Sequence, residues 1–172
     1  MRLSVLLVCC FPLLCWGKWS VVIDAGSTGS RLHLFRYTGG KLVAETLGKV
    51  EPGLSSFAQG GTSKHSKAIK SIENLLKRAA DRIKSTDQGA PAPVPLLVRA
   101  TAGMRLVPEA DQTRLYAAMR SDFATRVAPS LPVKFSLSIE TITGKQEAFF
   151  GFVSANFLGS CSFRYARCLS SS

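Results

Sequence analysis

The stretch VVIDAGSTGSR, residues 21–31, decides the fold of this 172-residue chain and contains its first candidate site. The β-branched run at its start predicts a buried strand that ends on the carboxylate of Asp24. Gly26 and Gly29 allow the following turn to bring backbone N–H groups together on an anion. Hydroxyl side chains add donors at three positions, Ser27, Thr28 and Ser30. Because a carboxylate repels phosphate, Asp24 is expected to hold a divalent cation, or a cation-bound water, beside the phosphate.

The rest of the chain alternates between strand patterns and helix patterns. Alternating or short apolar runs predict four further extended segments, at residues 31–37, 42–47, 96–100 and 133–139. Apolar residues at helical spacing predict three helices, over residues 64–84, about 108–127 and about 145–158. Ser63 or Ser66 is expected to cap the first of these helices, and Pro108 fits the first turn of the second.

In chain order these elements are β-β-β-α-β-α-β-α, which predicts an α/β protein with a mixed sheet. Three strands form an antiparallel meander, and crossover helices deliver two more strands parallel to the first. This order resembles the ribonuclease H-like plan that one lobe of actin, Hsp70 and the sugar kinases shares. In such a sheet, ligands bind beyond the carboxyl ends of the strands, where Asp24, Thr101 and residues 141–147 fall. The three turns are therefore expected to converge on one crevice.

The first 17 residues have the pattern of a secretory signal peptide. Arg2 supplies a short positive region, residues 3–14 form an apolar segment, and Cys15 and Gly17 lie at −3 and −1 of a cleavage point. The apolar segment is short for a membrane span. The protein is therefore expected to be secreted or to lie in the lumen of the secretory pathway. A retained signal anchor is the alternative, and it alone would bring the chain to a membrane.

Removal of the signal would leave two cysteines, Cys161 and Cys168, in an oxidising compartment. A local disulfide and two free thiols remain equal alternatives for this pair. Two lone cysteines without a nearby histidine do not predict a metal site.

The net charge of +11, from 22 basic and 11 acidic residues, favours anionic partners such as nucleotides, polyanions or acidic membrane surfaces. The basic residues are scattered, and the densest group lies over residues 64–84. That group is either the solvated face of a helix or a surface for nucleic acid or heparin. A hydrophobic content of 46% and a charged content of 19% exclude a disordered chain.

Three turns carry a likeness to a known family. Residues 24–31, DAGSTGSR, resemble the first apyrase motif of the nucleoside triphosphate diphosphohydrolases. Residues 100–106, ATAGMRL, resemble the second motif, and residues 142–158, ITGKQEAFFGFVSANFL, are similar to the third. The motifs stand in the family's order, and the resemblance covers about residues 19–158.

This resemblance implies an enzyme that removes terminal phosphates from nucleoside di- and triphosphates with Ca²⁺ or Mg²⁺, by attack of water and without a phosphoenzyme. It implies that Glu147 is the catalytic base and that Asp24 holds the metal through water. Phosphate contacts are implied for seven residues, Ser27, Thr28, Gly29, Ser30, Thr101, Ala102 and Gly103. The implied partners are nucleoside di- and triphosphates, and no specific nucleic acid is expected.

Two departures from the family pattern bear on activity. Ala148 stands where the third motif usually has glycine. The family's fourth and fifth motifs, which complete the other side of the site, have no counterpart after Leu158. The expected organisation is a signal peptide at 1–17, an N-terminal apyrase-like lobe at 18–158 and a divergent tail at 159–172. With the second lobe missing, hydrolysis is expected to be weak or absent.

Several residues keep a structural alternative. Glu147 at a helix start can serve only the helix dipole, and Thr101 can be an ordinary strand-end hydroxyl. Arg31 and Arg105 either reach phosphate or form surface ion pairs. His65 is expected to be solvated at a helix start. Three phenylalanines have the spacing of core contacts, Phe149, Phe150 and Phe152.

The functional alternative from a different class is a non-enzymatic, secreted basic fragment that binds nucleotides or polyanions. An enzyme of the same fold group that acts like an exopolyphosphatase or a kinase is a third hypothesis, which the third motif disfavours.

Overall fold

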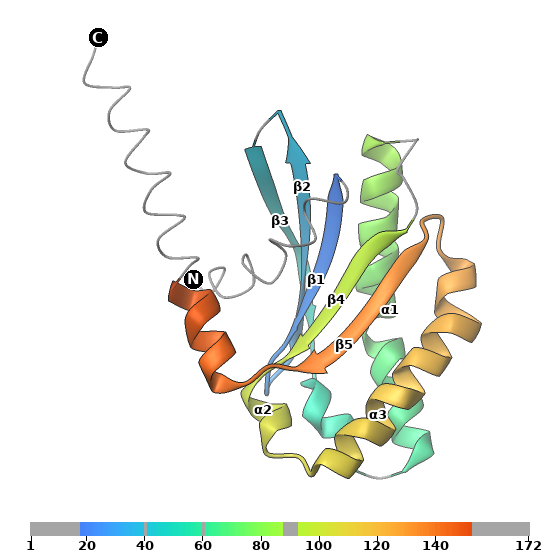
Figure 1. Ribbon diagram of the computed structural model, residues 1–172. Helices are drawn as coiled ribbons and strands as arrows, with labels where there is room; N and C mark the ends of the chain where they lie inside the picture. The colour runs from blue at the N-terminus through green and yellow to red at the C-terminus, as the bar shows by residue number, and fades with distance from the viewer. Residues whose placement is uncertain (1–17, 40, 60, 88–92, 153–172) are drawn as a thin grey trace.

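The computed structural model describes residues 18–39, 41–59, 61–87 and 93–152, which are built around one five-stranded sheet (Figure 1). The strands are β1 (Trp19–Ala25), β2 (Ser30–Thr38), β3 (Lys41–Val50), β4 (Val94–Ala100) and β5 (Phe135–Thr141). Their order across the sheet is β3-β2-β1-β4-β5. β1 pairs antiparallel with β2, and β2 with β3, whereas β1, β4 and β5 run parallel. This topology confirms the mixed, ribonuclease H-like sheet that the sequence predicts.

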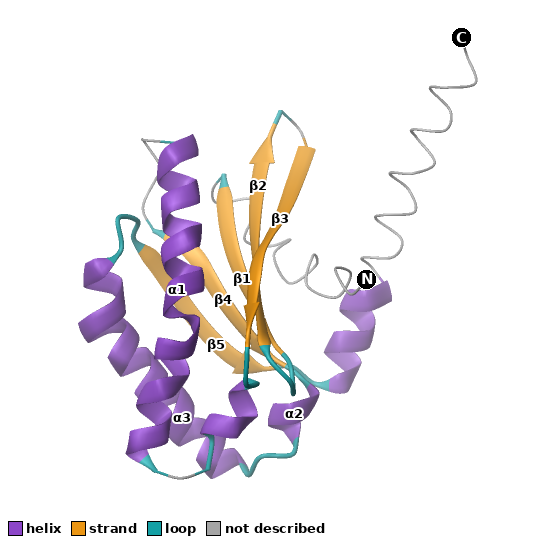
Figure 2. Ribbon diagram, turned by 180° about the vertical axis from the view of Figure 1, so that it is seen from behind, coloured by secondary structure: helices purple, strands orange, loops and turns teal. Residues whose placement is uncertain are grey.

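Helices α1 (Thr62–Thr86) and α3 (Glu109–Asp122) cover one face of the sheet (Figures 1 and 2). The long apolar stripe of α1 explains its position, because residues such as Ile69, Leu76 and Ile83 are fully buried against the strands. α3 contributes Leu115 and Met119 to the same core. The helical residues 144–152 follow β5 and lie on the opposite side of the sheet from α1 and α3 (Figures 1 and 2).

The predicted serine cap of α1 is wrong, and the helix begins two residues before the predicted start at about residue 64. The helix begins at Thr62, after Gly61, whose φ of 75° suits glycine, and no side chain caps it. Ser63 and Ser66 therefore lie inside the helix, where the Ser66 hydroxyl donates to the Ser63 carbonyl instead.

The helix predicted over residues 108–127 is divided. A short helix that the sequence did not predict, α2 (Ala102–Arg105), precedes Pro108, which is the N-cap of α3. After Asp122 the chain continues as a π-helical segment, η3 (Phe123–Val127), and a 3₁₀-helix, η4 (Ala128–Ser130). Pro129, within η4, has no N–H for α-helical hydrogen bonding, so a regular α-helix cannot continue through this segment.

Two further expectations are corrected by the packing. His65 is buried rather than solvated, and its Nε2 lies 3.2 Å from the carbonyl oxygen of Ala58. Phe149 and Phe152 are 59% and 68% exposed, so they are not core contacts among the described residues. The helix that carries them leaves the sheet rather than packing flat on it (Figure 1).

Some predictions fall outside the described residues: the signal segment, the pair Cys161 and Cys168, and the tail at 159–172. Over the residues that the structure does describe, none of the helices has the length and apolar character to cross a membrane.

Stability is expected to fall as the pH drops below about 6.5, because of His33 on β2. Burial lowers the pKa of His33 from its usual 6.5, and the charge of Arg31 lowers it further. The unfolded chain then binds a proton more readily than the folded chain, so stability is complete above the unfolded pKa and decreases at lower pH. The slope should reach at most about 1.4 kcal/mol per pH unit. Urea unfolding from about pH 7.5 to pH 5 measures this slope, and its persistence in His33→Gln would assign it to another group.

Candidate functional site

The three turns that follow β1, β4 and β5 meet at one end of the sheet. Backbone hydrogen bonds join them directly: the Thr101 N–H donates to the Ala25 carbonyl at 3.1 Å, and the Ile142 N–H donates to the Ala100 carbonyl at 2.9 Å. A crevice of about 150 Å³ lies between these turns. The predicted convergence is thus observed, and it follows from the parallel direction of three neighbouring strands.

Most of the predicted site residues line this crevice. They are Asp24, Ser27, Thr28, Gly29, Thr101, Ala102 and Glu147. Two predicted phosphate contacts, Ser30 and Gly103, are not among its lining residues. Ser30 is buried at the start of β2, where it pairs with Ala25 on the sheet face that the helices cover.

The first turn is arranged to receive an anion. It is closed by the Gly26 N–H, which donates to the Gly29 carbonyl at 3.0 Å. Ser27 and Thr28 at its tip are exposed, and within the described part of the chain their N–H groups make no backbone hydrogen bond. Two adjacent amides and two hydroxyls therefore remain available to a phosphate oxygen.

Glycines outside this turn set its position. A Cβ on Gly103 would lie 2.8 Å from Ser27 Cα. A Cβ on Gly53, in the connection between β3 and α1, would lie 2.3 Å from Ser27 O and 2.5 Å from Gly26 O. All three distances are shorter than real Cβ contacts, so each position must remain glycine for the turn to keep its place. Gly103 and Gly53 therefore both leave room for the turn, and Gly53 was not among the predicted site residues.

Glu147 is placed by a capping box at the start of the last helix. The Gln146 amide oxygen accepts hydrogen bonds from the Thr143 N–H and hydroxyl, at 2.8 and 3.0 Å, while the Thr143 hydroxyl lies 3.2 Å from the Gln146 N–H. The Glu147 N–H then donates to the Thr143 carbonyl at 2.9 Å. This turn directs the carboxylate into the crevice. The spacing Thr143-x-x-Gln146 was a visible signal for this helix start.

Arg105, at the end of α2, contacts the same carboxylate. Its Nη1 donates to Glu147 Oε2 at 2.8 Å and to the Ile142 carbonyl at 3.1 Å. Both side chains of the ion pair are 33% exposed. Of the two sequence alternatives for Arg105, the observed state is therefore an ion pair, made with the predicted base.

A row of charged side chains crosses the sheet at the crevice, and three of them, Asp24, Arg31 and Arg99, line it. Asp24 is the register partner of Arg31 on β2 and of Arg99 on β4, and Arg99 is the partner of Glu140 on β5. Arg99 is only 8% exposed, and its Nε lies 3.0 Å from Glu140 Oε1. Its Nη1 donates to the Ser138 hydroxyl at 3.2 Å. Two guanidinium groups thus flank Asp24, which favours a polyanion above it.

Arg99 was not among the predicted site residues, because it lies in the otherwise apolar run 96–100. A charged residue within a buried strand was the available signal, since such residues are rarely buried unless they are paired.

A small network of polar side chains fixes the second turn. The Gln112 amide donates to the carbonyls of Met104 and Val107, at 2.9 and 2.8 Å. The Thr141 hydroxyl donates to the Gln112 amide oxygen at 2.6 Å and lies 2.6 Å from the Tyr116 hydroxyl. Burial raises the pKa of Tyr116, which keeps this hydroxyl neutral. The network ties α2, α3 and the end of β5 together.

The donor set of the crevice suits a hard divalent cation. Among the residues that the structure describes, no group of three or more His, Cys, Asp or Glu side chains is arranged to hold a metal. The Asp24 carboxylate and nearby hydroxyls are oxygen donors, which Ca²⁺ and Mg²⁺ prefer, and Mg²⁺ commonly keeps several waters beside one or two carboxylates and the substrate phosphates. The Asp24 carboxylate beside these hydroxyls therefore fits a cation held mainly through water.

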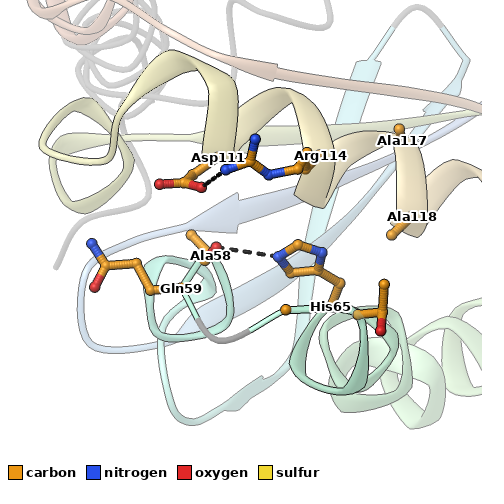
Figure 3. Close-up of a pocket in the computed structure, with 9 residues that line it drawn as sticks. Ala58, Gln59, His65, Asp111, Arg114, Ala117 and Ala118 are labelled. Atoms are coloured by element: carbon orange, nitrogen blue, oxygen red, sulfur yellow. Dashed lines mark hydrogen bonds and ion pairs between the residues drawn. The ribbon is translucent and has the colours of Figure 1, made fainter.

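A larger cavity, of about 590 Å³, lies elsewhere (Figure 3). One wall is α3, where Asp111 and Arg114 form an ion pair, and the other is the segment with Ala58 and His65. None of the three turns lines it, and these polar groups already have partners inside the protein. Size alone therefore does not identify the site, and we place the candidate site in the smaller crevice.

Comparison with known proteins gives a consistent family relationship. Residues 16–163 match the model of the GDA1/CD39 (nucleoside phosphatase) family. The chain is 32% identical over 145 residues to the guanosine-diphosphatase of Saccharomyces cerevisiae, covering 82% of this chain and 26% of that protein. It is 31% identical over 146 residues to the human nucleoside diphosphate phosphatase ENTPD5, covering 81% of this chain and 32% of that protein.

Among solved structures, a nucleoside triphosphate hydrolase from Neospora caninum aligns with a TM-score of 0.45 and 18% identity. The alignment covers 74% of this chain and 29% of that structure. The chain thus spans about a quarter to a third of the length of these relatives.

Proposed function

We propose that this chain, which belongs to the GDA1/CD39 (nucleoside phosphatase) family, binds the phosphates of nucleoside di- and triphosphates in the crevice and hydrolyses the terminal phosphate. One observation carries the proposal: Ser27, Thr101 and Glu147, from three distant parts of the sequence, line the same small crevice. Phosphate donors and a carboxylate side by side are the arrangement that attack of water on a phosphoryl group requires.

The first turn is proposed to hold the terminal phosphate. The amides and hydroxyls of Ser27 and Thr28 would donate to its oxygens, and Gly29, which lines the same crevice, would contact it through its backbone. Thr101 and Ala102 would contact the phosphate from the second turn. Ser30 and Gly103, which do not line the crevice, would hold strand β2 and the first turn in place. Donors fixed before the reaction stabilise the charge that develops on the phosphoryl oxygens.

Glu147 is proposed as the base that orients the attacking water and accepts its proton. Its Oε2 is engaged by Arg105, which leaves Oε1 for the water. In this arrangement Oε2 fixes the orientation of the Glu147 side chain, and Oε1 accepts the proton of the attacking water.

Asp24 is proposed to hold Ca²⁺ or Mg²⁺ through a water molecule. When bound, the cation supplies positive charge that neutralises the phosphate oxygens. Asn at position 24 would retain the shape but lose the charge of the carboxylate. We therefore expect Asp24→Asn to raise the half-saturating Ca²⁺ concentration for nucleotide binding by about 10- to 100-fold. Calorimetric titration at several Ca²⁺ concentrations measures this shift, and an unchanged Ca²⁺ dependence would contradict the metal assignment.

Hydrolysis by this chain alone is proposed to be slow. Ser27 and Thr28 are exposed and Glu147 is one-third exposed, so bulk water has access to the groups that bind and attack the phosphate. Electrostatic stabilisation is weaker in water than in a closed site. The expected organisation, a signal peptide at 1–17, a lobe at 18–158 and a tail at 159–172, is proposed on the sequence pattern. It would place the protein in the secreted fraction or in the lumen of the secretory pathway.

The proposal is tested by measuring binding and phosphate release together. GDP, UDP, ADP and ATP are titrated into the chain with Ca²⁺ or Mg²⁺, and phosphate is measured under single turnover with excess protein. Release that stops on addition of EDTA supports a metal-assisted nucleotidase. If neither binding nor release is detected, the proposal is wrong. Retention on heparin that nucleotides do not affect would support the polyanion-binding alternative.

A further inference from the structure

Arg105 contacts a residue that lines the crevice but does not line the crevice itself. Glu147 is a lining residue, whereas Arg105 is not, although the two side chains form an ion pair. The guanidinium therefore contacts the carboxylate without itself lining the crevice. Through one nitrogen it also holds the Ile142 carbonyl, which belongs to the backbone that leads into the third turn.

Both ends of this contact are fixed to the fold. On one side, the carbonyls on either side of Arg105, those of Met104 and Val107, accept hydrogen bonds from Gln112 on α3. Met104 itself is almost fully buried, so α2 has little freedom to move. On the other side, the Thr143 and Gln146 capping box holds the first helical turn that carries Glu147. A charged hydrogen bond between two anchored groups restricts the rotamer of the carboxylate.

We propose that Arg105 is a positioning residue for Glu147, an inference that rests on the function proposed above. It holds Oε2 and so directs Oε1 toward the place of the attacking water. It does not bind phosphate. Misplacement of a reacting group by about 1 Å can cost about 10²-fold in rate, so loss of this contact should reduce the rate of the chemical step more than nucleotide affinity.

The test compares Arg105→Met, Arg105→Lys and a matched control, Arg114→Met. Arg114 also makes an ion pair with a nearby carboxylate, Asp111, but it lies on α3 and does not line the crevice. We expect Arg105→Met to slow single-turnover phosphate release by about 10- to 100-fold, with the dissociation constant of the nucleotide changed less than about threefold. Arg105→Lys should restore part of the rate, because an ammonium group can still donate to the carboxylate. Arg114→Met should change neither quantity.

A second measurement does not depend on activity. Hydrogen exchange of the Glu147 amide reports opening of the turn, and we expect it to be about threefold to tenfold faster in Arg105→Met than in Arg114→Met. Equal exchange in these two variants, or a nucleotide dissociation constant raised more than tenfold with an unchanged single-turnover rate, would overturn the positioning role. If the unmodified chain neither binds nor hydrolyses nucleotide, the function is wrong, while the exchange result still decides whether Arg105 orders Glu147.

Discussion

Glu147→Gln is expected to reduce phosphate release by about 10²- to 10⁴-fold while nucleotide affinity changes by less than about threefold. The amide keeps the size of the side chain and can keep the contact with Arg105 through its oxygen, but it cannot accept a proton from water. The loss should therefore appear in the rate of the chemical step. Single-turnover phosphate release and calorimetric titration with a non-hydrolysable nucleotide separate the rate from the affinity.

The matched control for this substitution is Glu109→Gln. Glu109 is an exposed carboxylate in the first turn of α3 and does not line the crevice. It should leave both the rate and the affinity unchanged. If Glu147→Gln releases phosphate as fast as the unmodified chain, the Glu147 carboxylate is not the base.

Gly53→Ala should weaken nucleotide binding by more than about tenfold and lower the free energy of unfolding by about 1–3 kcal/mol. The added Cβ would lie 2.3 and 2.5 Å from two backbone oxygens, Ser27 O and Gly26 O. Backbone atoms cannot rotate away as a flexible side chain can, so the first turn must shift. The shift would move the Ser27 and Thr28 amides away from the phosphate, although Gly53 itself does not line the crevice.

Gly144→Ala is the control for this effect. Gly144 begins the helical residues that carry Glu147, and apart from its chain neighbours and its own helix backbone no atom lies within 4 Å of the Cβ that alanine would add. Alanine should be neutral or slightly stabilising there, since glycine is the weaker helix former. Urea unfolding and nucleotide titration of both variants measure the difference. If Gly53→Ala and Gly144→Ala have the same free energy of unfolding and the same nucleotide affinity, the first turn tolerates a Cβ at position 53 and the prediction is wrong.

Local patterns predicted the elements of the fold and the turns of the site. The β-branched run before Asp24, the apolar stripe of α1 and the small-residue turns each depend on neighbours in the sequence, so their pattern was readable. Parallel strand direction then placed Asp24, Thr101 and Glu147 at one end of the sheet. The errors came at positions where local pattern conflicts with packing: Ser63 within α1, His65 buried beside Ala58, and Phe149 exposed on a helix that leaves the sheet.

By itself, the sequence determined the order of the five strands and the longer helices, the family and the three turns, because short-range periodicity and motifs carry that information. Only the tertiary structure decided which groups touch. Arg105 meets Glu147 across 42 residues, and Arg99 lies in register with Asp24 on a neighbouring strand. Gly53 leaves room for Ser27. Such contacts depend on register, on side-chain direction and on distances of a few ångströms between segments that are far apart in the chain, and no local pattern encodes those quantities.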